Sequence, residues 1–227
     1  MIAILSDIHG NWTALQKVLS MIDAMKIDTI YNLGDVTGYY SEVNECCDEL
    51  RARNVVSVMG NHDWYLATGT PCKRSRSVND CLAYQKQIIT AENLAWIQSL
   101  PPAITTDDIN FVHGGWNDNI DEYLTPSISY FKNHDGRYFV SGHTHKQCVE
   151  NYGDKMYCNP GSVGQPRDGD NRAAFAVFDG GNFLLQRTTY DIDRTCHLMD
   201  EAGFNGYYYG CLYTGAEHLQ WRVECNR

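Results

Sequence analysis

Five of the eight histidines stand in short polar clusters, and each cluster directly follows an apolar run. The clusters offer imidazole nitrogens, carboxylate oxygens and one amide oxygen, but no thiolate. This mixture of ligand atoms suits manganese, iron or zinc better than magnesium or calcium, which favour shells of oxygen. Along the chain, the clusters are Asp7-Ile8-His9, Gly34-Asp35, Gly60-Asn61-His62-Asp63, His113-Gly114 and Gly142-His143-Thr144-His145.

The number of candidate ligands predicts two metal ions. One ion needs fewer donors than the clusters supply, whereas two ions about 3.5–4 Å apart that share a carboxylate would use them all. Asp35 stands alone on its loop and is the natural bridge. His134, His197 and His218 lie outside the clusters, and we interpret them as surface or packing residues. The seven predicted ligands are Asp7, His9, Asp35, Asn61, His113, His143 and His145.

The apolar runs before the first three clusters predict strands that deliver polar residues to one edge of a sheet. These runs cover residues 2–5, 29–33 and 55–59, and helical spacing of apolar residues follows in 12–25 and 44–53. Strands that alternate with helices indicate a largely parallel α/β sheet, whose carboxyl ends form the usual ligand crevice. Residues 70–100 are predicted to be helical, with Thr90 as an N-cap inside this stretch.

The second half of the chain changes to strands and tight turns. We expect strands over 109–113, 137–141, 148–152, 156–159, 173–179 and 183–190, with Asp179-Gly180-Gly181-Asn182 as a hairpin turn between the last two. These strands predict a second sheet. A short helix over 193–202 should end at Gly203, a favourable residue after a helix. Residues 1–227 are predicted to form a single domain, in which 191–227 supply a C-terminal helix and a tail of unknown role.

Charge and composition limit the classes of partner. The formal net charge of −10 and the pI of about 5.1 argue against a duplex nucleic acid as partner, because the field of the whole protein repels polyanions. Bound cations would supply the local positive charge that a phosphate substrate needs. The nine cysteines include no Cys-x-x-Cys pair, and neither a signal peptide nor a long apolar span is evident. We therefore expect free thiols, a cytoplasmic location and no membrane partner; the oligomeric state stays open.

In their order and spacing, the clusters resemble the calcineurin-like metallophosphoesterase superfamily. Its Asp-x-His, Gly-Asp, Gly-Asn-His-Asp/Glu, His and Gly-His-x-His blocks all stand here, between Asp7 and His145. The segment 159–167 extends the resemblance toward the small bacterial and archaeal phosphodiesterase-like members. The resemblance implies an α/β fold of two packed mixed β-sheets flanked by helices, a four-layer sandwich.

The resemblance also implies roles for individual residues. His62 would stabilise a phosphoryl oxygen or protonate the leaving group, and Asp63 would orient or polarise that histidine. The ligands divide between two metals, one held by Asp7, His9, Asp35 and His145 and the other by Asp35, Asn61, His113 and His143.

We therefore expect a phosphoesterase in which a hydroxide shared by two divalent transition-metal ions attacks phosphorus in line. Manganese is the preferred metal, with iron or zinc as alternatives. The substrate is a small phosphate ester, with a nucleotide as one candidate. The similarity to the phosphodiesterase-like group favours a diester, and a phosphomonoester or a dinucleoside polyphosphate is the alternative. A non-catalytic scaffold, such as the retromer subunit that resembles this superfamily, is disfavoured because every ligand position and His62 are present.

Three further residues are candidates for substrate binding. Asn11 could contact the phosphate, or equally cap the helix that follows it. Arg167 and Arg172 could hold a phosphate by forked hydrogen bonds, with simple surface exposure as the alternative. Similarly, an aromatic wall or ordinary loop packing would account for Tyr39, Tyr40 and Trp116. The basic run Lys73-Arg74-Ser75-Arg76 is interpreted as a solvated loop, with substrate contact as the alternative.

Overall fold

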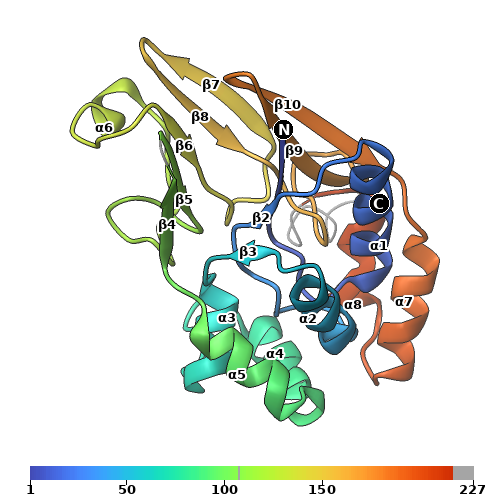
Figure 1. Cartoon of the computed structure of the whole chain (residues 1–227). Coiled ribbons are helices and arrows are strands. Elements are labelled where there is room, and N and C mark those ends of the chain that lie inside the picture. The colour runs from blue at the N-terminus through green and yellow to red at the C-terminus, as the bar shows by residue number, and fades with distance from the viewer. Residues whose placement is uncertain (107, 217–227) are drawn as a thin grey trace, which may run out of the picture.

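The computed structural model describes residues 1–106 and 108–216, and these build two five-stranded β-sheets that pack against each other (Figure 1). The strand order is β10-β9-β1-β2-β3 in the first sheet and β4-β5-β6-β8-β7 in the second. Both sheets combine parallel and antiparallel pairs, which confirms the predicted pair of mixed sheets. The strands are β1 (Ile2–Leu5), β2 (Ile30–Asn32), β3 (Val56–Ser57), β4 (Ala103–Thr106), β5 (Ile109–Val112), β6 (Tyr138–Val140), β7 (Cys148–Tyr152), β8 (Lys155–Asn159), β9 (Ala173–Asp179) and β10 (Asn182–Thr188).

Helices flank the first sheet, and a short helix lies beside the second (Figure 1). The largest apolar core lies between the first sheet and its helices, where Leu15 and Ile22 of α1 meet Leu5 of β1 and Phe175 of β9. The helices are α1 (Trp12–Ala24), α2 (Val43–Ala52), α3 (Asn61–Thr68), α4 (Arg76–Ile88), α5 (Ala91–Ser99), α6 (Ile128–Phe131), α7 (Ile192–Glu201) and α8 (Gly206–Tyr209), followed by the 3-10 helix η1 (Gly210–Tyr213).

A second apolar core joins the two sheets. Ile4 and Ala176 of the first sheet pack in one cluster with Phe111, Val140 and Cys158 of the second. Burial on both faces explains why β1 reads as a continuous apolar run rather than an alternating one. The two sheets therefore hold each other in place, and the polar ends of their strands meet at one edge of the sandwich.

The hairpin of β9 and β10 lies in a different sheet from the one predicted. We expected all the strands of the second half to form the second sheet, but β9 pairs antiparallel with β1, and β10 extends the first sheet beyond it. Burial explains this placement, because residues 173–177 are buried throughout and a strand of that kind needs cover on both faces.

Three local features also differ from the sequence prediction. The predicted helical stretch 70–100 consists of two helices, α4 and α5, which are separated where Thr90 caps the second one through Asn93 N. The cluster after β3 forms the first turn of α3, a helix that we had not predicted. Strand β4 was also missed, and its partly exposed side chains lack a strong apolar pattern.

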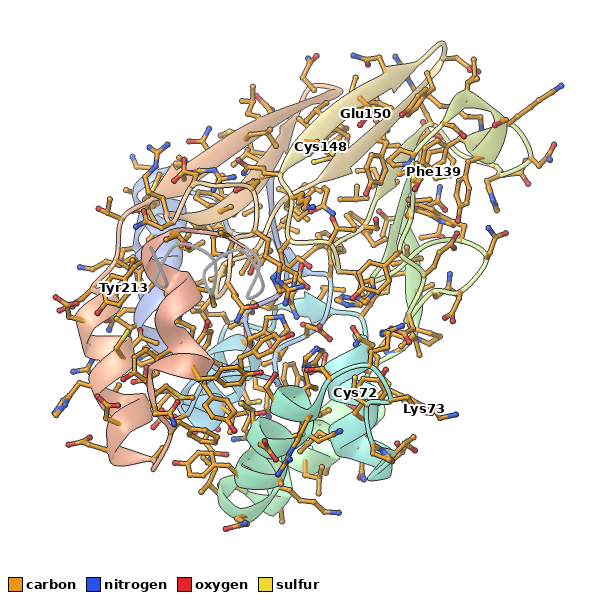
Figure 2. The ribbon with its side chains drawn as sticks, turned by 180° about the vertical axis from the view of Figure 1, so that it is seen from behind. Cys72, Lys73, Phe139, Cys148, Glu150 and Tyr213 are labelled. Atoms are coloured by element: carbon orange, nitrogen blue, oxygen red, sulfur yellow. The ribbon has the colours of Figure 1, made fainter. Side chains whose placement is uncertain are left out.

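The C-terminal segment packs against the rest of the chain. Helix α7 ends as predicted, with Gly203 in the left-handed region just after it. Met199 and Leu212 join Tyr40 in an apolar cluster. Residues 217–227, which include His218, lie outside the described residues. Viewed from behind in Figure 2, Tyr213 of η1 and Lys73, on the segment between α3 and α4, lie on different sides of the molecule.

Two expectations about the whole chain concern its thiols and membranes. The eight cysteines of the described ranges are all free, and seven of them are buried. Within the part of the chain that the structure describes, no helix has both the length and the apolar character that crossing a bilayer requires.

Candidate metal centre

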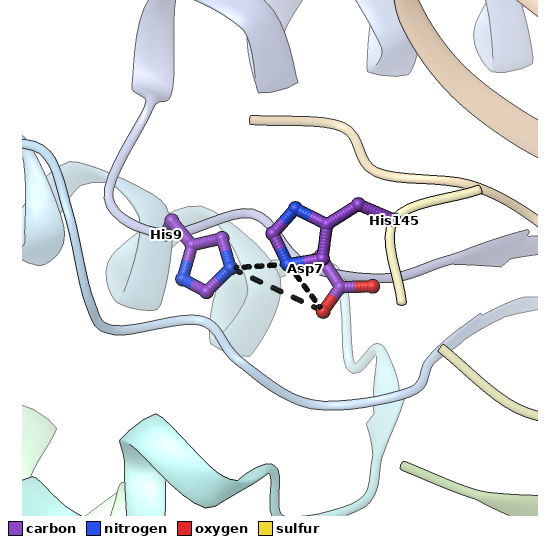
Figure 3. A group of neighbouring side chains, drawn as sticks. All are labelled: Asp7, His9 and His145. Atoms are coloured by element: carbon purple, nitrogen blue, oxygen red, sulfur yellow. Dashed lines mark hydrogen bonds and ion pairs between the residues drawn. The ribbon is translucent and has the colours of Figure 1, made fainter. Parts of the chain in front are cut away.

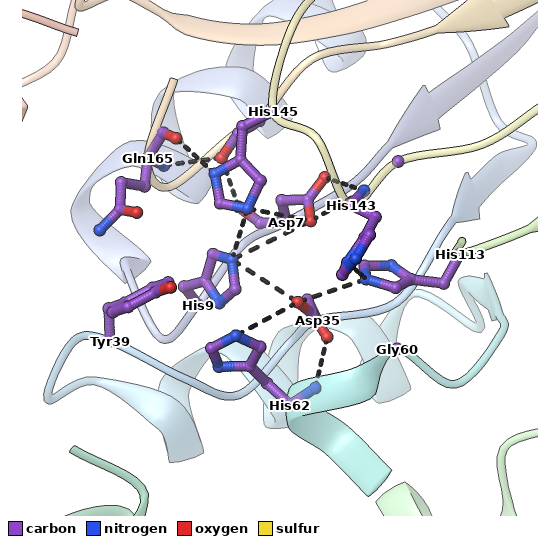
Figure 4. Close-up of polar contacts among 12 residues, drawn as sticks. Asp7, His9, Asp35, Tyr39, Gly60, His62, His113, His143, His145 and Gln165 are labelled. Carbon is purple, nitrogen blue, oxygen red and sulfur yellow. Dashed lines mark hydrogen bonds and ion pairs between the residues drawn. The ribbon is translucent and has the colours of Figure 1, made fainter. Parts of the chain in front are cut away.

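The structure brings all seven predicted ligands into one buried cluster at the carboxyl ends of the strands, and Figure 4 labels all of them except Asn61. Strands β1, β2 and β3 of the first sheet lead to four of them. Strands β5 and β6 of the second sheet lead to the other three, so the cluster lies on the seam between the sheets. The first sheet contributes Asp7, His9, Asp35 and Asn61, and the second contributes His113, His143 and His145.

Backbone conformation marks the same residues. Seven described residues other than glycine have φ in the left-handed region, and five of these are predicted ligands. Their φ angles lie between 54° and 65°, where the side chain crowds its own backbone and the cost is about 1–2 kcal/mol per residue. Strain of this kind is concentrated at functional sites, where the surrounding structure enforces it. The five residues are Asp7, His9, Asp35, His143 and His145.

Two glycines of the polar clusters lie so close to neighbouring residues that a side chain would not fit. A Cβ atom on Gly60 would lie 2.1 Å from Asp35 Oδ1, and one on Gly142 would lie 1.9 Å from Ser6 Oγ. Neither glycine has a positive φ, so space alone excludes a side chain at these two positions.

Asp7, His9 and His145 form one half of the cluster (Figure 3). His9 Nε2 lies 3.1 Å from His145 Nε2, and His145 Nε2 lies 3.3 Å from Asp7 Oδ1. The other nitrogen of each ring meets a backbone carbonyl: His9 Nδ1 lies 2.9 Å from Thr37 O, and His145 Nδ1 lies 2.6 Å from Gln165 O. These carbonyls accept hydrogen bonds, so each Nδ1 carries the proton and each Nε2 presents a lone pair.

Asp35, Asn61, His113 and His143 form the other half. His113 Nδ1 donates to Leu33 O at 2.8 Å, which leaves a lone pair on Nε2. That Nε2 faces Asn61 Oδ1 at 3.0 Å, His143 Nδ1 at 3.2 Å and Asp35 Oδ2 at 3.4 Å. Asp35 Oδ2 also lies 3.7 Å from His9 Nε2, so this carboxylate stands between the two halves.

The donor set fits bound cations. In each half, imidazole nitrogens face carboxylate oxygens, an amide oxygen or one another at 3.0–3.4 Å. Acceptors that face each other in a buried site repel unless a proton or a metal ion lies among them. Neutral imidazole held by a second hydrogen bond is also the usual form of a histidine ligand.

Electrostatics distinguish the two halves. Burial lowers the pKa of His9 well below its ordinary value, and burial together with Arg167 lowers that of His145. Burial also acts to lower the pKa of His113, but the nearby Asp35 carboxylate outweighs it and raises that pKa. Burial in turn raises the pKa of Asp35. The contact between Asp35 and His113 therefore favours a bound proton at the place where a metal ion would replace it.

His62 lies at the edge of the cluster, beside Asp35 (Figure 4). Its Nε2 is 3.9 Å from Asp35 Oδ2, and its backbone N–H donates to Asp35 Oδ1 at 2.8 Å. His9, Asp35 and His62 can also be grouped around a single ion, so His62 lies within reach of a bound metal.

The role predicted for Asp63 needs correction. Its carboxylate accepts from the backbone N–H of Thr37 at 2.9 Å and of Gly60 at 3.1 Å, and the structure shows no hydrogen bond from it to the His62 ring among the described residues. Asp63 is the third residue of α3, from which an acidic side chain reaches back to the helix start. It therefore ties together the loops that carry Asp35 and Asn61.

Of the three predicted substrate-binding residues, only Arg167 lies at the cluster. The Asn11 side chain caps α1 through Ala14 N and donates to Gly164 O, so the capping alternative is correct. The side chain of Arg172 is exposed and pairs with Asp170 at the surface. Arg167 donates to Tyr39 OH at 2.9 Å, and its charge reaches His9, His62 and His145.

The aromatic residues are arranged differently from the predicted wall. The Tyr39 ring lies 4.6 Å from that of His9 and 5.0 Å from that of His62, beside the cluster. Tyr40 and Trp116 are packing residues. Tyr40 is buried in the apolar cluster with Met199, and the Trp116 ring packs edge-on against Phe139. Sequence reasoning missed Tyr123, whose ring lies 4.1 Å from that of His143. No local pattern in the sequence singles this tyrosine out.

Two cavities adjoin the cluster. One, of about 550 Å³, runs from Asn61 past Trp64 and Tyr65 to Lys73 and Arg74. The other, of about 470 Å³, is lined by Tyr123, Thr144 and Arg167 among others. Volumes of 300–1,000 Å³ are usual for small-molecule sites, so either cavity can hold an organic group.

Comparison with known proteins decides the family. The family model of the calcineurin-like phosphoesterase superfamily domain matches residues 1–182. The chain belongs to this superfamily. Membership in the calcineurin-like phosphoesterases identifies it as a hydrolase of the phosphoesterase type, in a family that uses divalent metal ions, and the buried cluster is its candidate metal site.

Several known proteins are similar to most of the chain. An uncharacterized protein of Methanocaldococcus jannaschii is 36% identical over an alignment 222 residues long, and this alignment covers 86% of this chain and 89% of that protein. The crystal structure of a metallophosphoesterase from Sphaerobacter thermophilus has a TM-score of 0.82 and 32% identity, and covers 95% of this chain and 98% of its own. A hypothetical protein from Pyrococcus horikoshii has a TM-score of 0.85, with 95% and 99% coverage, and at 21% identity supports the fold alone.

Proposed function

We propose that the protein is a phosphodiesterase that works with two divalent transition-metal ions, of which manganese is the preferred one. The observation that carries this proposal is the set of facing acceptors: the lone pairs of His9, His145 and Asp7 converge on one point, and those of His113, Asn61 and His143 on another. Asp35 Oδ2 stands between the two points and is the proposed bridge.

The proposed division of labour follows from position. Two bound cations would supply an activated water as nucleophile and neutralise charge on the phosphoryl oxygens. His62 lies at the rim of the cluster and can hold a proton for the leaving oxygen. Arg167 projects its charge toward the same histidines and can bind a phosphoryl oxygen, while Gln165 Oε1 holds its guanidinium in place at 2.7 Å.

The two cavities support a diester as substrate. A phosphodiester carries an organic group on each side of phosphorus, and the cluster has one cavity beyond Asn61 and another beyond Thr144 and Arg167. A monoester would leave one of these cavities unused. We therefore favour a small diester or a related nucleotide, handled in the cytoplasm, over a phosphomonoester or a dinucleoside polyphosphate.

The test compares aryl phosphate mono- and diesters with metal-free protein, with protein reloaded with manganese, and with metal content measured in parallel. We expect no turnover without metal, recovery as the content approaches two ions per chain, and a higher kcat/KM for the diester. Full activity at a metal content near zero would refute the metal proposal. Faster turnover of the monoester would assign the alternative activity, and two bound ions without turnover of any ester would favour a scaffold.

A further inference from the structure

We propose that Asp121 is a positioning residue that accepts a hydrogen bond from Nε2 of His143 and so holds Nδ1 of that ring toward the second ion. The inference rests on the proposed metal centre. It concerns a residue that lies outside every sequence cluster, on the loop between β5 and α6.

The orientation of the His143 ring determines which of its nitrogens can bind an ion. Its Nδ1 faces the cluster, 3.2 Å from His113 Nε2, so this nitrogen is the one available to an ion. A neutral imidazole that binds metal through Nδ1 must carry its proton on Nε2. That second nitrogen points away from the cluster and is buried, and among the described residues it has no hydrogen-bond partner.

Asp121 supplies the nearest acceptor. Its Oδ1 lies 3.7 Å from His143 Nε2, within about 1 Å of a hydrogen bond. A buried N–H without a partner costs about 1–3 kcal/mol, so a small closing movement of ring or loop is favourable. The other three histidine ligands each have a backbone carbonyl at the second nitrogen, and His143 alone among the four would use a side chain.

Two side chains contact the Asp121 carboxylate, each at a different oxygen. Arg74 forms an ion pair with Oδ1, and Tyr65 OH donates to Oδ2 at 3.3 Å. The Arg74 guanidinium also lies 5.1 Å above the Tyr123 ring, which in turn covers the His143 ring at 4.1 Å. The contacts of Arg74 and Asp121 thus join the segment before α4 and the loop after β5 behind the proposed second metal position.

Metal affinity in four proteins tests the inference. The wild type is compared with Asp121→Ala, Asp121→Asn and Arg74→Gln by manganese titration with electron paramagnetic resonance and with a competing chelator. We expect Asp121→Ala to bind one ion normally and the other about 10–100-fold more weakly, the usual effect of losing such a partner. Asn retains an oxygen acceptor, so Asp121→Asn should recover part of the loss.

Arg74→Gln is the matched control, because it removes the same ion pair but leaves the carboxylate that faces His143. Near-normal affinity for both ions in this variant, together with the loss in Asp121→Ala, supports the inference. Equal losses in both variants would mean that the ion pair only holds the loops together, and normal affinity in Asp121→Ala would also overturn the inference. A wild type that never binds two ions would instead refute the metal centre itself.

Discussion

The second nitrogen of each imidazole determines what the first one can bind. Backbone carbonyls of Thr37, Leu33 and Gln165 accept from His9, His113 and His145. The first two carbonyls belong to the loop after β2, and the third belongs to the loop after β8. The lone pairs are therefore aimed by the backbone before any ion arrives. Ligands fixed in this way lose little conformational freedom on binding, which favours affinity.

Two separate alanine variants, Asp35→Ala and His62→Ala, distinguish loss of the metal centre from loss of catalysis. In Asp35→Ala the carboxylate between the two halves is gone, so metal content and turnover should fall together. His62→Ala should keep both ions and lose about 10²–10⁴-fold in turnover if the ring donates a proton. Metal analysis and steady-state kinetics, with circular dichroism to confirm folding, give the answer. Loss of ions from the His62 variant would make that residue a ligand.

Metal binding at pH 7 should release about one proton per chain. The pKa of His113 is raised by Asp35, so the metal-free pair holds a proton that an ion must displace. Burial lowers the pKa values of His9 and His145, and these rings are already neutral. Affinity should thus rise with pH up to the raised pKa of His113 and then level off. Calorimetry in buffers of different ionisation enthalpy measures the proton count, and a count of zero would contradict the charge assignment.

Candidate site residues could be predicted from the sequence where they belong to a recognisable local pattern. The seven predicted ligands stand in polar clusters after apolar runs, and the structure places them all in one buried group. Asp121 and Tyr123 could not be found in this way, because their contact with His143 depends on how two loops meet in space. For Asn11, capping a helix and contacting a phosphate use the same side-chain atoms, so the sequence cannot distinguish the two roles. The hydrogen bond from Ala14 N to Asn11 Oδ1 in the structure identifies the capping role.

At the level of elements, the short turn after each strand is what brings the ligands together. Five predicted ligands lie in left-handed conformations, and two glycines allow neighbouring loops to approach within van der Waals contact. The sequence predicts these turns, because glycine and polar residues interrupt apolar runs. It does not predict which strand lies beside β1, since pairing with β9 joins segments about 170 residues apart.

Gly60→Ala should disturb the metal centre without touching a ligand side chain. The new methyl group would lie 2.3 Å from the Asp35 backbone nitrogen as well as against its carboxylate, so the loop after β2 must move. We expect a loss of about 1–3 kcal/mol in the free energy of unfolding and weaker metal binding. Gly206→Ala is the control, because its methyl group meets only Tyr209 at an ordinary 3.9 Å. Thermal unfolding and metal titration measure both effects, and normal metal affinity in Gly60→Ala would contradict the steric argument.

At the level of the whole molecule, the proposed ions lie between the two sheets. Asp7 and His9 follow β1 of the first sheet, while His145 follows β6 of the second, and one ion would contact all three. The described sheets also share an apolar core that does not depend on metal. The metal-free protein should therefore fold, but with lower stability.

Removal of metal should lower the melting temperature. An ion present at 100 times its dissociation constant adds about 2.7 kcal/mol to the free energy of unfolding. Scanning calorimetry of metal-free and manganese-loaded protein measures this shift, and Asp35→Ala should show little of it. An identical melting temperature with and without bound ions would mean that the ions do not join the sheets.

The position of the ions on this seam also bears on the lifetime of the folded state. An ion that requires both Asp7 and His145 cannot find its complete set of ligands until segments far apart in the chain have docked. We expect its contacts to form after the folding transition state, and such late contacts slow unfolding while leaving the folding rate almost unchanged. Manganese should prolong the survival of the native protein in denaturant, and a refolding chain should gain no speed from it.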